Sequence, residues 1–275
     1  MPDHRVSLDV LNSEWSDCNM CDLGVRRDAS CSRIITGDGE VGGVMFIGTC
    51  PNKIENEVGR VFYDEEGETL RSLARHYGIP SYFTNLLLCR GCEQASNSEG
   101  ELVWNMNRKT GVKTPYIVDR PPTTPQIEAC RPRLYEEIYK VDPQIIVALG
   151  TDVAKALTQS GRYGGMRSEH GQTTEILVPG AGRIPSLTEK KQAWFRKVHG
   201  EYVLPTEQRM VRYLMFPTFH PSEVSNNSHD MRNGSIPDLY VEDIALLGKI
   251  IRSLREHSHP QERRPKQEED TCQEQ

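Results

Sequence analysis

Four short apolar runs, separated by helix-like stretches, constrain the fold of this chain more than any other feature. The runs are 43–48 (GVMFIG), 82–89 (YFTNLLLC), 144–150 (QIIVALG) and 212–218 (RYLMFPT). All are rich in β-branched, aromatic or other large apolar residues and end at Gly, Pro or polar residues, which is typical of buried strands. Strands that alternate with helices pair in parallel. The pattern predicts an α/β fold, a three-layer α/β/α sandwich around a short, mainly parallel four-stranded sheet.

Apolar spacing and capping residues indicate where the helices lie. The first carries Leu70, Leu73 and Ala74 at positions i, i+3 and i+4, and the second opens with Thr124 as N-cap and Pro125 in its first turn. We expect helices over 64–76, 125–141, 151–159 and 237–257.

The polar segments indicate one large domain with two insertions and a C-terminal tail. At 275 residues the chain allows one large domain or two small ones. We expect a single domain over 1–257 with polar insertions near 92–122 and 163–207. Loops of that length are either functional or disordered. Residues 258–275 are charged, contain Pro and Gln and lack aromatics, which predicts a disordered tail.

Composition indicates where in the cell the protein is expected. No run approaches 18 apolar residues, so we expect no membrane span, and the N-terminus lacks the apolar region of a signal peptide. We therefore expect an intracellular monomer, cytoplasmic in a prokaryote or in a phage-infected cell. The net charge of −6 counts mildly against nucleic-acid binding, unless basic residues gather on one face.

The eight cysteines point to a metal centre rather than to disulfides, because a reducing compartment disfavours disulfides. Cys18 and Cys21 have the spacing of a metal knuckle, Cys89 ends an apolar run and Cys130 lies in a predicted helix. Four thiolates suit a 4Fe–4S cluster or structural zinc. Cys92 leaves open a zinc-ribbon-like quartet in which it replaces Cys130. Cys89 and Cys130 also fit ordinary buried thiols.

Four separated pieces of the chain, taken in order, resemble the family 4 (iron–sulfur) uracil-DNA glycosylases. They are Cys18-x2-Cys21, residues 84–90 (TNLLLCR), the lone Cys130 and residues 219–222 (FHPS), with 48–52 (GTCPN) between the first two. The resemblance implies a divergent member that hydrolyses the N-glycosidic bond of a flipped uracil, or a related base, in single- or double-stranded DNA for base-excision repair. It also implies a 4Fe–4S cluster, with zinc as the alternative, held by Cys18, Cys21, Cys89 and Cys130. Cys31, Cys50 and Cys272 then lie outside the ligand set.

The same resemblance assigns a base pocket. Ligands of parallel sheets bind at the carboxyl ends of the strands, where 48–52, Asn85 and His220 fall. Phe62, in 59–62 (GRVF), stacks on the base. Asn85 reads its edge, because a carboxamide offers a donor and an acceptor. His220 stabilises the negative charge that develops on the leaving base, and Cys50 belongs to the same pocket.

Thr49 departs from the family pattern, which has Glu at this position. A neutral hydroxyl orients water but does not offset the positive charge of an oxocarbenium-like sugar. Asn52 is a candidate water contact, and Asp64 is either a substitute carboxylate or a helix N-cap. This departure keeps open a catalytically weak or inactive DNA-binding member of the same fold. The Cys92 quartet keeps open a zinc-ribbon-containing α/β protein of unrelated role.

Contacts to DNA phosphates are expected from polar side chains on loops. The candidates are Arg90, Arg120, Arg167, His170, Ser222 and the basic stretch 190–197.

Overall fold

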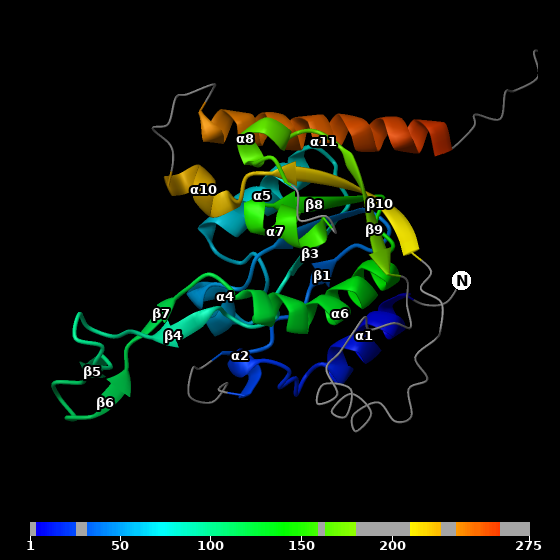
Figure 1. Cartoon of the computed structure of the whole chain (residues 1–275). Helices are drawn as coiled ribbons and strands as arrows, with labels where there is room; N and C mark the ends of the chain where they lie inside the picture. Colours follow the sequence, from blue (N-terminus) through cyan, green and yellow to red (C-terminus); the bar gives the residue numbers. More distant parts are fainter. Residues whose placement is uncertain (1–3, 26–31, 159–162, 180–209, 227–234, 259–275) are drawn as a thin grey trace, which may run out of the picture.

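A six-stranded sheet forms the centre of the protein (Figure 1). The computed structural model describes residues 4–25, 32–158, 163–179, 210–226 and 235–258. The strand order is β1-β3-β2-β8-β10-β9. The four inner strands run parallel and are β3 (Ser81–Asn85), β2 (Val44–Gly48), β8 (Ile145–Leu149) and β10 (Met210–Thr218). The antiparallel edge strands are β1 (Asp38–Gly39) and β9 (Thr174–Pro179).

The α/β class and the mainly parallel sheet are confirmed, whereas the predicted count of four strands is wrong. The four apolar runs overlap the four inner strands. β2 and β8 are buried throughout, β3 in all but its first residue and β10 in its carboxyl-terminal part, so these segments read as continuous apolar runs. The two edge strands lack that pattern. β1 is two residues long, and half of β9 is exposed. The second run also ends its strand at Asn85, after which Leu86 and Leu87 donate backbone hydrogen bonds to Gly48 and Thr49.

Alternate residues of each inner strand pack on opposite faces of the sheet, which produces the three layers. In β2, Val44 and Phe46 face one side while Met45 and Ile47 face the other. The first side is covered by α5 (Glu65–His76) and α11 (Ile236–Ser258). The second is covered by α1 (His4–Glu14), α6 (Thr124–Val141) and α7 (Thr151–Leu157).

The predicted helices form close to the predicted bounds. α5 starts after Asp64, whose carboxylate accepts a hydrogen bond from the Gly67 N–H at 2.8 Å. The N-cap of α6 is Thr123, one residue before the predicted Thr124. The helix α1 was not predicted. Four helices of six residues or fewer were also missed, because a single turn or two shows no apolar period: α2 (Asp22–Val25), α4 (Lys53–Val58), α8 (Met166–Glu169) and α10 (Pro221–Asn226).

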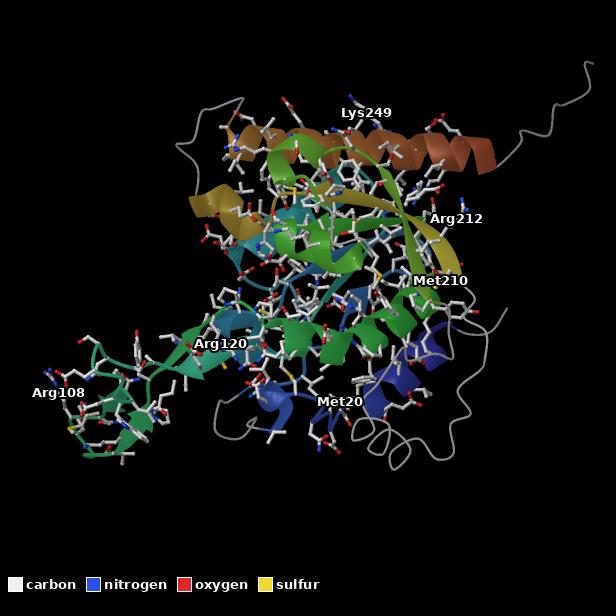
Figure 2. All side chains as sticks on the ribbon, in the orientation of Figure 1. Met20, Arg108, Arg120, Met210, Arg212 and Lys249 are labelled. Carbon is white, nitrogen blue, oxygen red and sulfur yellow. The ribbon has the colours of Figure 1, made fainter. Side chains whose placement is uncertain are left out.

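The polar stretch after β3 folds into two short antiparallel ribbons that project from the body (Figures 1 and 2). β4 (Cys92–Gln94) pairs with β7 (Ile117–Asp119) at the root, and β5 (Trp104–Met106) pairs with β6 (Lys113–Pro115) farther out. We call residues 92–119 the projecting ribbon. Arg108 lies at its far end and Arg120 at its root (Figure 2).

Several expectations concern parts of the chain that lie outside the described residues. These are the tail beyond residue 258, the basic stretch 190–197 and two cysteines, Cys31 and Cys272. No described helix is long and apolar enough to cross a membrane. The division into one domain with two insertions remains a prediction.

Candidate active site

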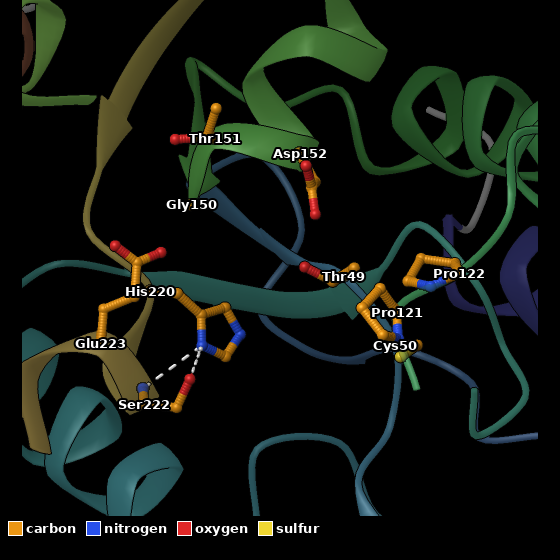
Figure 3. Close-up of a pocket in the computed structure, with 10 residues that line it drawn as sticks. All are labelled: Thr49, Cys50, Pro121, Pro122, Gly150, Thr151, Asp152, His220, Ser222 and Glu223. Atoms are coloured by element: carbon orange, nitrogen blue, oxygen red, sulfur yellow. Dashed lines mark hydrogen bonds between the residues drawn. The ribbon is translucent and has the colours of Figure 1, made fainter. Parts of the chain in front are cut away.

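A cavity of about 330 Å³ opens at the carboxyl ends of β2, β8 and β10 (Figure 3). Its walls come from the segments that follow these strands and from the turn before α6. The lining residues are Thr49, Cys50, Pro121, Pro122, Gly150, Thr151, Asp152, His220, Ser222 and Glu223. Among the residues predicted from sequence, the structure therefore brings Thr49, Cys50, His220 and Ser222 to one cavity. This is the edge of the sheet at which parallel strands bind ligands.

His220 is a neutral side chain that points into the cavity (Figure 3). Burial lowers its pKa to about 4, against an opposing effect of the Asp64 carboxylate. The Ser222 N–H lies 3.3 Å from Nδ1, and the Ser222 Oγ lies 2.8 Å from it. Because a backbone N–H only donates, we assign Nδ1 as an acceptor, which places the ring proton on Nε2. The site therefore holds an uncharged N–H donor.

Asn85 ends β3 with a buried and incompletely bonded carboxamide. Its side chain is 2% exposed, and its Nδ2 has no hydrogen-bond partner among the described residues. Leaving a buried donor unpaired costs roughly 1–3 kcal/mol, so such groups in folded proteins call for an explanation. A ligand that accepts a hydrogen bond would provide one.

A buried polar network holds the backbone of Asn85 in place. The Arg133 guanidinium donates to the Asn85 carbonyl oxygen at 2.7 Å and pairs with Glu137. Glu137 also accepts hydrogen bonds from the hydroxyls of Tyr82 and Thr84, each at 2.9 Å. These contacts tie the end of β3 to α6 and so restrict movement of the carboxamide.

Phe62 meets Asn85 beside Gly48. A Cβ on Gly48 would lie 2.4 Å from Asn85 Oδ1 and 2.7 Å from Phe62 Cζ, so both side chains approach the same point. They do not line the cavity of Figure 3. They lie next to it, because Gly48 directly precedes the lining residue Thr49. The sequence predicts Phe62 and Asn85 in one pocket, and in the structure both side chains approach Gly48.

The backbone of Phe62 is held in an unusual conformation. Its φ of 51° is in the left-handed region, which is rare for a bulky residue. Its N–H donates to the Glu55 carboxylate, and its carbonyl oxygen accepts from Arg71 Nε at 3.1 Å. Strained backbone that is fixed by surrounding hydrogen bonds is concentrated at functional sites.

Glu55 is a site residue that the sequence analysis did not identify. It is buried, and that burial raises its pKa to about 7, although the N–H groups of Asn52 and Phe62 favour its charged form. Asn52 and Glu55 form a capping box at the start of α4. The spacing Asn-x-x-Glu was the signal that could have revealed it.

Asn52 and Asp64 are used as helix caps. The Asn52 Oδ1 accepts from the Glu55 N–H at 2.9 Å, and its Nδ2 donates to Asp64. Asp64 also caps α5, as its N-cap interpretation anticipated. Neither residue lines the cavity, although the Asp64 charge acts on His220. A water-binding role for Asn52 remains a prediction.

Two carboxylates that sequence analysis overlooked line the cavity. Asp152 lies in the first turn of α7, two residues after Gly150, and Glu223 follows Ser222 (Figure 3). Burial raises the pKa of Glu223, and the Asp152 charge adds to that effect. Listing the residues that follow every strand end would have found both. They provide negative charge in a site where Thr49 has none.

The four cysteines assigned as ligands lie in or against one core cluster. Cys18, Cys89 and Cys130 are buried in the same core cluster, and Cys21 packs against it. Burial raises the pKa of Cys130, and the charge of Cys21 makes a smaller contribution in the same direction. None of the six described cysteines forms a disulfide. A set of four thiols from α6, the segment that follows β3 and the N-terminal segment fits an iron–sulfur cluster in donor type and number.

Neither the four-cysteine set nor the zinc alternatives form a converged ligand group among the described residues. Within the described part of the chain, no three His, Cys, Asp or Glu side chains come together as metal ligands would. Cys92 lies apart from the core cluster and close to Cys50, whose pKa is raised to about 11 by burial and, in smaller part, by Cys92. The assignment of Cys130, rather than Cys92, as the fourth ligand remains a prediction.

The predicted DNA contacts differ in their surroundings. Arg90 is buried and pairs with Asp119. Arg120 pairs with Asp22 and Glu93, at 3.4 and 3.2 Å. The His170 ring lies 3.0 Å from Asp243. These three side chains have carboxylate partners, whereas Arg167 is exposed on α8 and Ser222 lines the cavity.

Comparison with known proteins adds independent information. The family model "Uracil DNA glycosylase superfamily" matches residues 37–243. The chain is 27% identical over 158 residues to a type-4 uracil-DNA glycosylase of Pyrobaculum aerophilum, which covers 56% of this chain and 66% of that protein.

Two further type-4 uracil-DNA glycosylases are similar. That of Thermotoga maritima is 24% identical over 249 residues, 89% of this chain and 95% of its own. That of Archaeoglobus fulgidus is 25% identical over 153 residues, 54% of this chain and 62% of its own. The chain thus spans just under two thirds of the Pyrobaculum and Archaeoglobus proteins and nearly all of the Thermotoga protein. Because the family model matches more than half of the chain, this protein belongs to the uracil DNA glycosylase superfamily.

Proposed function

We propose that this protein is a DNA glycosylase that hydrolyses the N-glycosidic bond of a flipped uracil, or a related base, for base-excision repair. The observation that carries the proposal is the unpartnered Asn85 Nδ2, which lies beside Phe62 and next to a cavity that contains a neutral His220. Superfamily membership and the names of the three relatives support it.

Asn85 and Phe62 recognise the base. A uracil edge presents a carbonyl acceptor and an N–H donor, which a carboxamide can pair with simultaneously. The Asn85 Nδ2, which has no partner among the described residues, donates to the carbonyl, so base binding satisfies a buried donor. The ring of Phe62 provides an apolar face on which the flipped base stacks.

His220 stabilises the leaving base. Cleavage of the bond from C1′ to N1 leaves negative charge on the uracil ring. The Nε2–H of a neutral imidazole donates to the uracil oxygen on which that charge develops. The Ser222 N–H keeps the proton on Nε2 by donating to Nδ1.

Asp152 and Glu223 replace the charge that Thr49 lacks. The sugar acquires positive charge as the bond breaks, and a nearby carboxylate favours that state. Thr49 provides a hydroxyl that orients the attacking water, and both carboxylates line the same cavity (Figure 3). We expect slower excision than a carboxylate at position 49 would give, because Asp152 is exposed and its charge is screened by solvent.

A metal cluster has a structural role in this proposal. Cys18, Cys21, Cys89 and Cys130 would hold a 4Fe–4S cluster, which would join the N-terminal segment to the segment that follows β3 and to α6. The chemistry that it supplies when bound is thiolate cross-linking, which would restrain the segment that follows Asn85.

The test is an excision assay on matched single- and double-stranded oligonucleotides that contain one uracil, followed by alkaline cleavage. We expect cleavage at the uracil, and its loss in Asn85→Ala. The second candidate function is a DNA-binding protein without glycosylase activity, which Thr49 favours. Tight binding of uracil DNA with no cleavage at high enzyme concentration would establish that alternative. We further propose that the protein acts as an intracellular monomer.

A further inference from the structure

The outer half of the projecting ribbon differs in charge from the rest of the chain. Residues 102–117 contain Arg108, Lys109 and Lys113 and no acidic residue, in a chain of net charge −6. None of these three cations forms an ion pair with a carboxylate of the described residues. The segment is therefore a local positive region at the tip of a projection (Figure 2).

The same segment exposes large apolar side chains. Trp104 is 50% exposed, and the others of this kind are Leu102, Met106, Val112 and Tyr116. Successive residues of a strand point to opposite faces, so Trp104 and Met106 share one face of β5. Their cross-strand partners are Pro115 and Lys113. One face of the ribbon thus combines an indole ring, a thioether and an ammonium group.

Backbone and side-chain hydrogen bonds hold this face in a defined shape. Asn107 Oδ1 accepts from the N–H of Lys109 at 3.0 Å and from that of Thr110 at 3.3 Å, and Gly111 has the positive φ of 70° that the turn requires. Arg108 and Lys109 belong to the turn that the backbone bond between Asn107 and Val112 closes, and Arg108 lies at the far end of the ribbon (Figure 2). A preformed surface loses less conformational entropy on binding than a flexible one does.

The ribbon leads directly to the cavity. β7 ends at Asp119, and the chain continues through Arg120 to Pro121 and Pro122, which line the cavity. Arg120 fixes this junction through its ion pairs with Asp22 and Glu93 and through its backbone bond to Gly91 at 2.9 Å. The root of the ribbon therefore lies next to a wall of the cavity.

We propose that the outer half of the ribbon binds single-stranded DNA that flanks the flipped nucleotide. An unpaired base stacks on Trp104, and phosphates pair with Arg108, Lys109 and Lys113. An aromatic side chain surrounded by cations is how proteins hold single strands without reading their sequence. The choice of DNA as the ligand rests on the proposed function, whereas the location and chemistry of the surface do not.

The test measures binding of undamaged oligonucleotides, so it does not depend on excision. Trp104→Ala is expected to weaken binding of single-stranded DNA about tenfold, the loss typical of one stacked base. A triple variant should lose the phosphate contacts: Arg108→Ala, Lys109→Ala, Lys113→Ala. The slope of the logarithm of the binding constant against the logarithm of the salt concentration is expected to fall by about 2, since each lost phosphate contact contributes about 0.7 for a single strand. Binding of a single-stranded oligonucleotide is also expected to quench Trp104 fluorescence.

The matched control removes three exposed cations from α11, in the variant Lys249→Ala, Arg252→Ala, Arg255→Ala, and is expected to keep the native slope. Melting temperatures should equal the native value in all variants, because the ribbon lies outside the core clusters. Trp104→Tyr should retain most of the affinity.

Three outcomes would overturn the inference. They are native affinity in both ribbon variants, an equal loss for duplex and single-stranded DNA in Trp104→Ala, and an unchanged salt slope in the triple variant. If the native protein excises uracil and the ribbon variants bind DNA normally, the DNA-binding role of the ribbon is refuted and the proposed function is not. Ribbon variants that lose binding, in a protein that does not excise uracil, refute the proposed function alone.

Discussion

Gly48→Ala tests whether Phe62 and Asn85 form one base pocket. The added Cβ would lie 2.4 Å from Asn85 Oδ1 and 2.7 Å from Phe62 Cζ. Carbon atoms in contact prefer about 3.5–4.0 Å, so one or both side chains must move by about 1 Å. A displacement of that size in a positioning group can reduce the rate about 100-fold. Overpacking a core position typically costs about 1–3 kcal/mol of stability.

The assay is kcat/KM for excision from a uracil-containing single strand, together with thermal melting. A control should lose stability without touching the site. Gly78→Ala fits, because Gly78 has a φ of 67° and nothing within 4 Å of its Cβ position. It is expected to cost about 1–2 kcal/mol through backbone strain and to leave kcat/KM unchanged. A folded Gly48→Ala protein with native kcat/KM would refute the shared pocket.

Three further predictions follow from the site. Asp152→Asn and Glu223→Gln should each lower the excision rate on the order of tenfold, which corresponds to about 1.4 kcal/mol, while Thr49→Glu should raise the rate. A native excision rate in the variant that carries both carboxylate substitutions would show that neither charge is used. His220 has a folded pKa of about 4, below its ordinary value of 6.5, so the unfolded chain binds the proton first as pH falls. Its contribution to stability is therefore present above pH 6.5 and is lost toward pH 4. The melting temperature of His220→Gln should depend less on pH over this range than that of the native protein. Parallel plots of melting temperature against pH would contradict the neutral state of His220. Cys130→Ser should lose bound iron and melt at a lower temperature, whereas Cys92→Ser should keep its iron; the reverse pattern, measured by iron and sulfide content, would identify Cys92 as the ligand.

The sequence determined the inner sheet, because its strands are buried on both faces. Every residue of β2 and β8 is in the core, so burial leaves an apolar run that is visible without a structure. The edge strand β9 escaped prediction because half of it faces solvent. The projecting ribbon escaped for a similar reason, since all three residues of both β5 and β6 are exposed.

The sequence also supplied the candidate residues at the strand ends. Thr49, Asn85 and His220 each follow or end an apolar run, and in a parallel sheet these ends share one edge. The sequence could not show that Asp64 and Asn52 bond to each other as caps, or that Arg120 and His170 pair with carboxylates far along the chain. Such pairing depends on which elements the fold brings together.

Tertiary structure alone decided which charges surround the cavity. Asp152 and Glu223 belong to ordinary helix starts in the sequence, and they become site residues because α7 and α10 begin at the same edge of the sheet as Thr49. The pKa values of His220 and Glu55 were equally hidden, because they depend on burial by residues distant in sequence. Local sequence determines which residues form strands and helices, but desolvation and charge proximity are properties of the assembled fold.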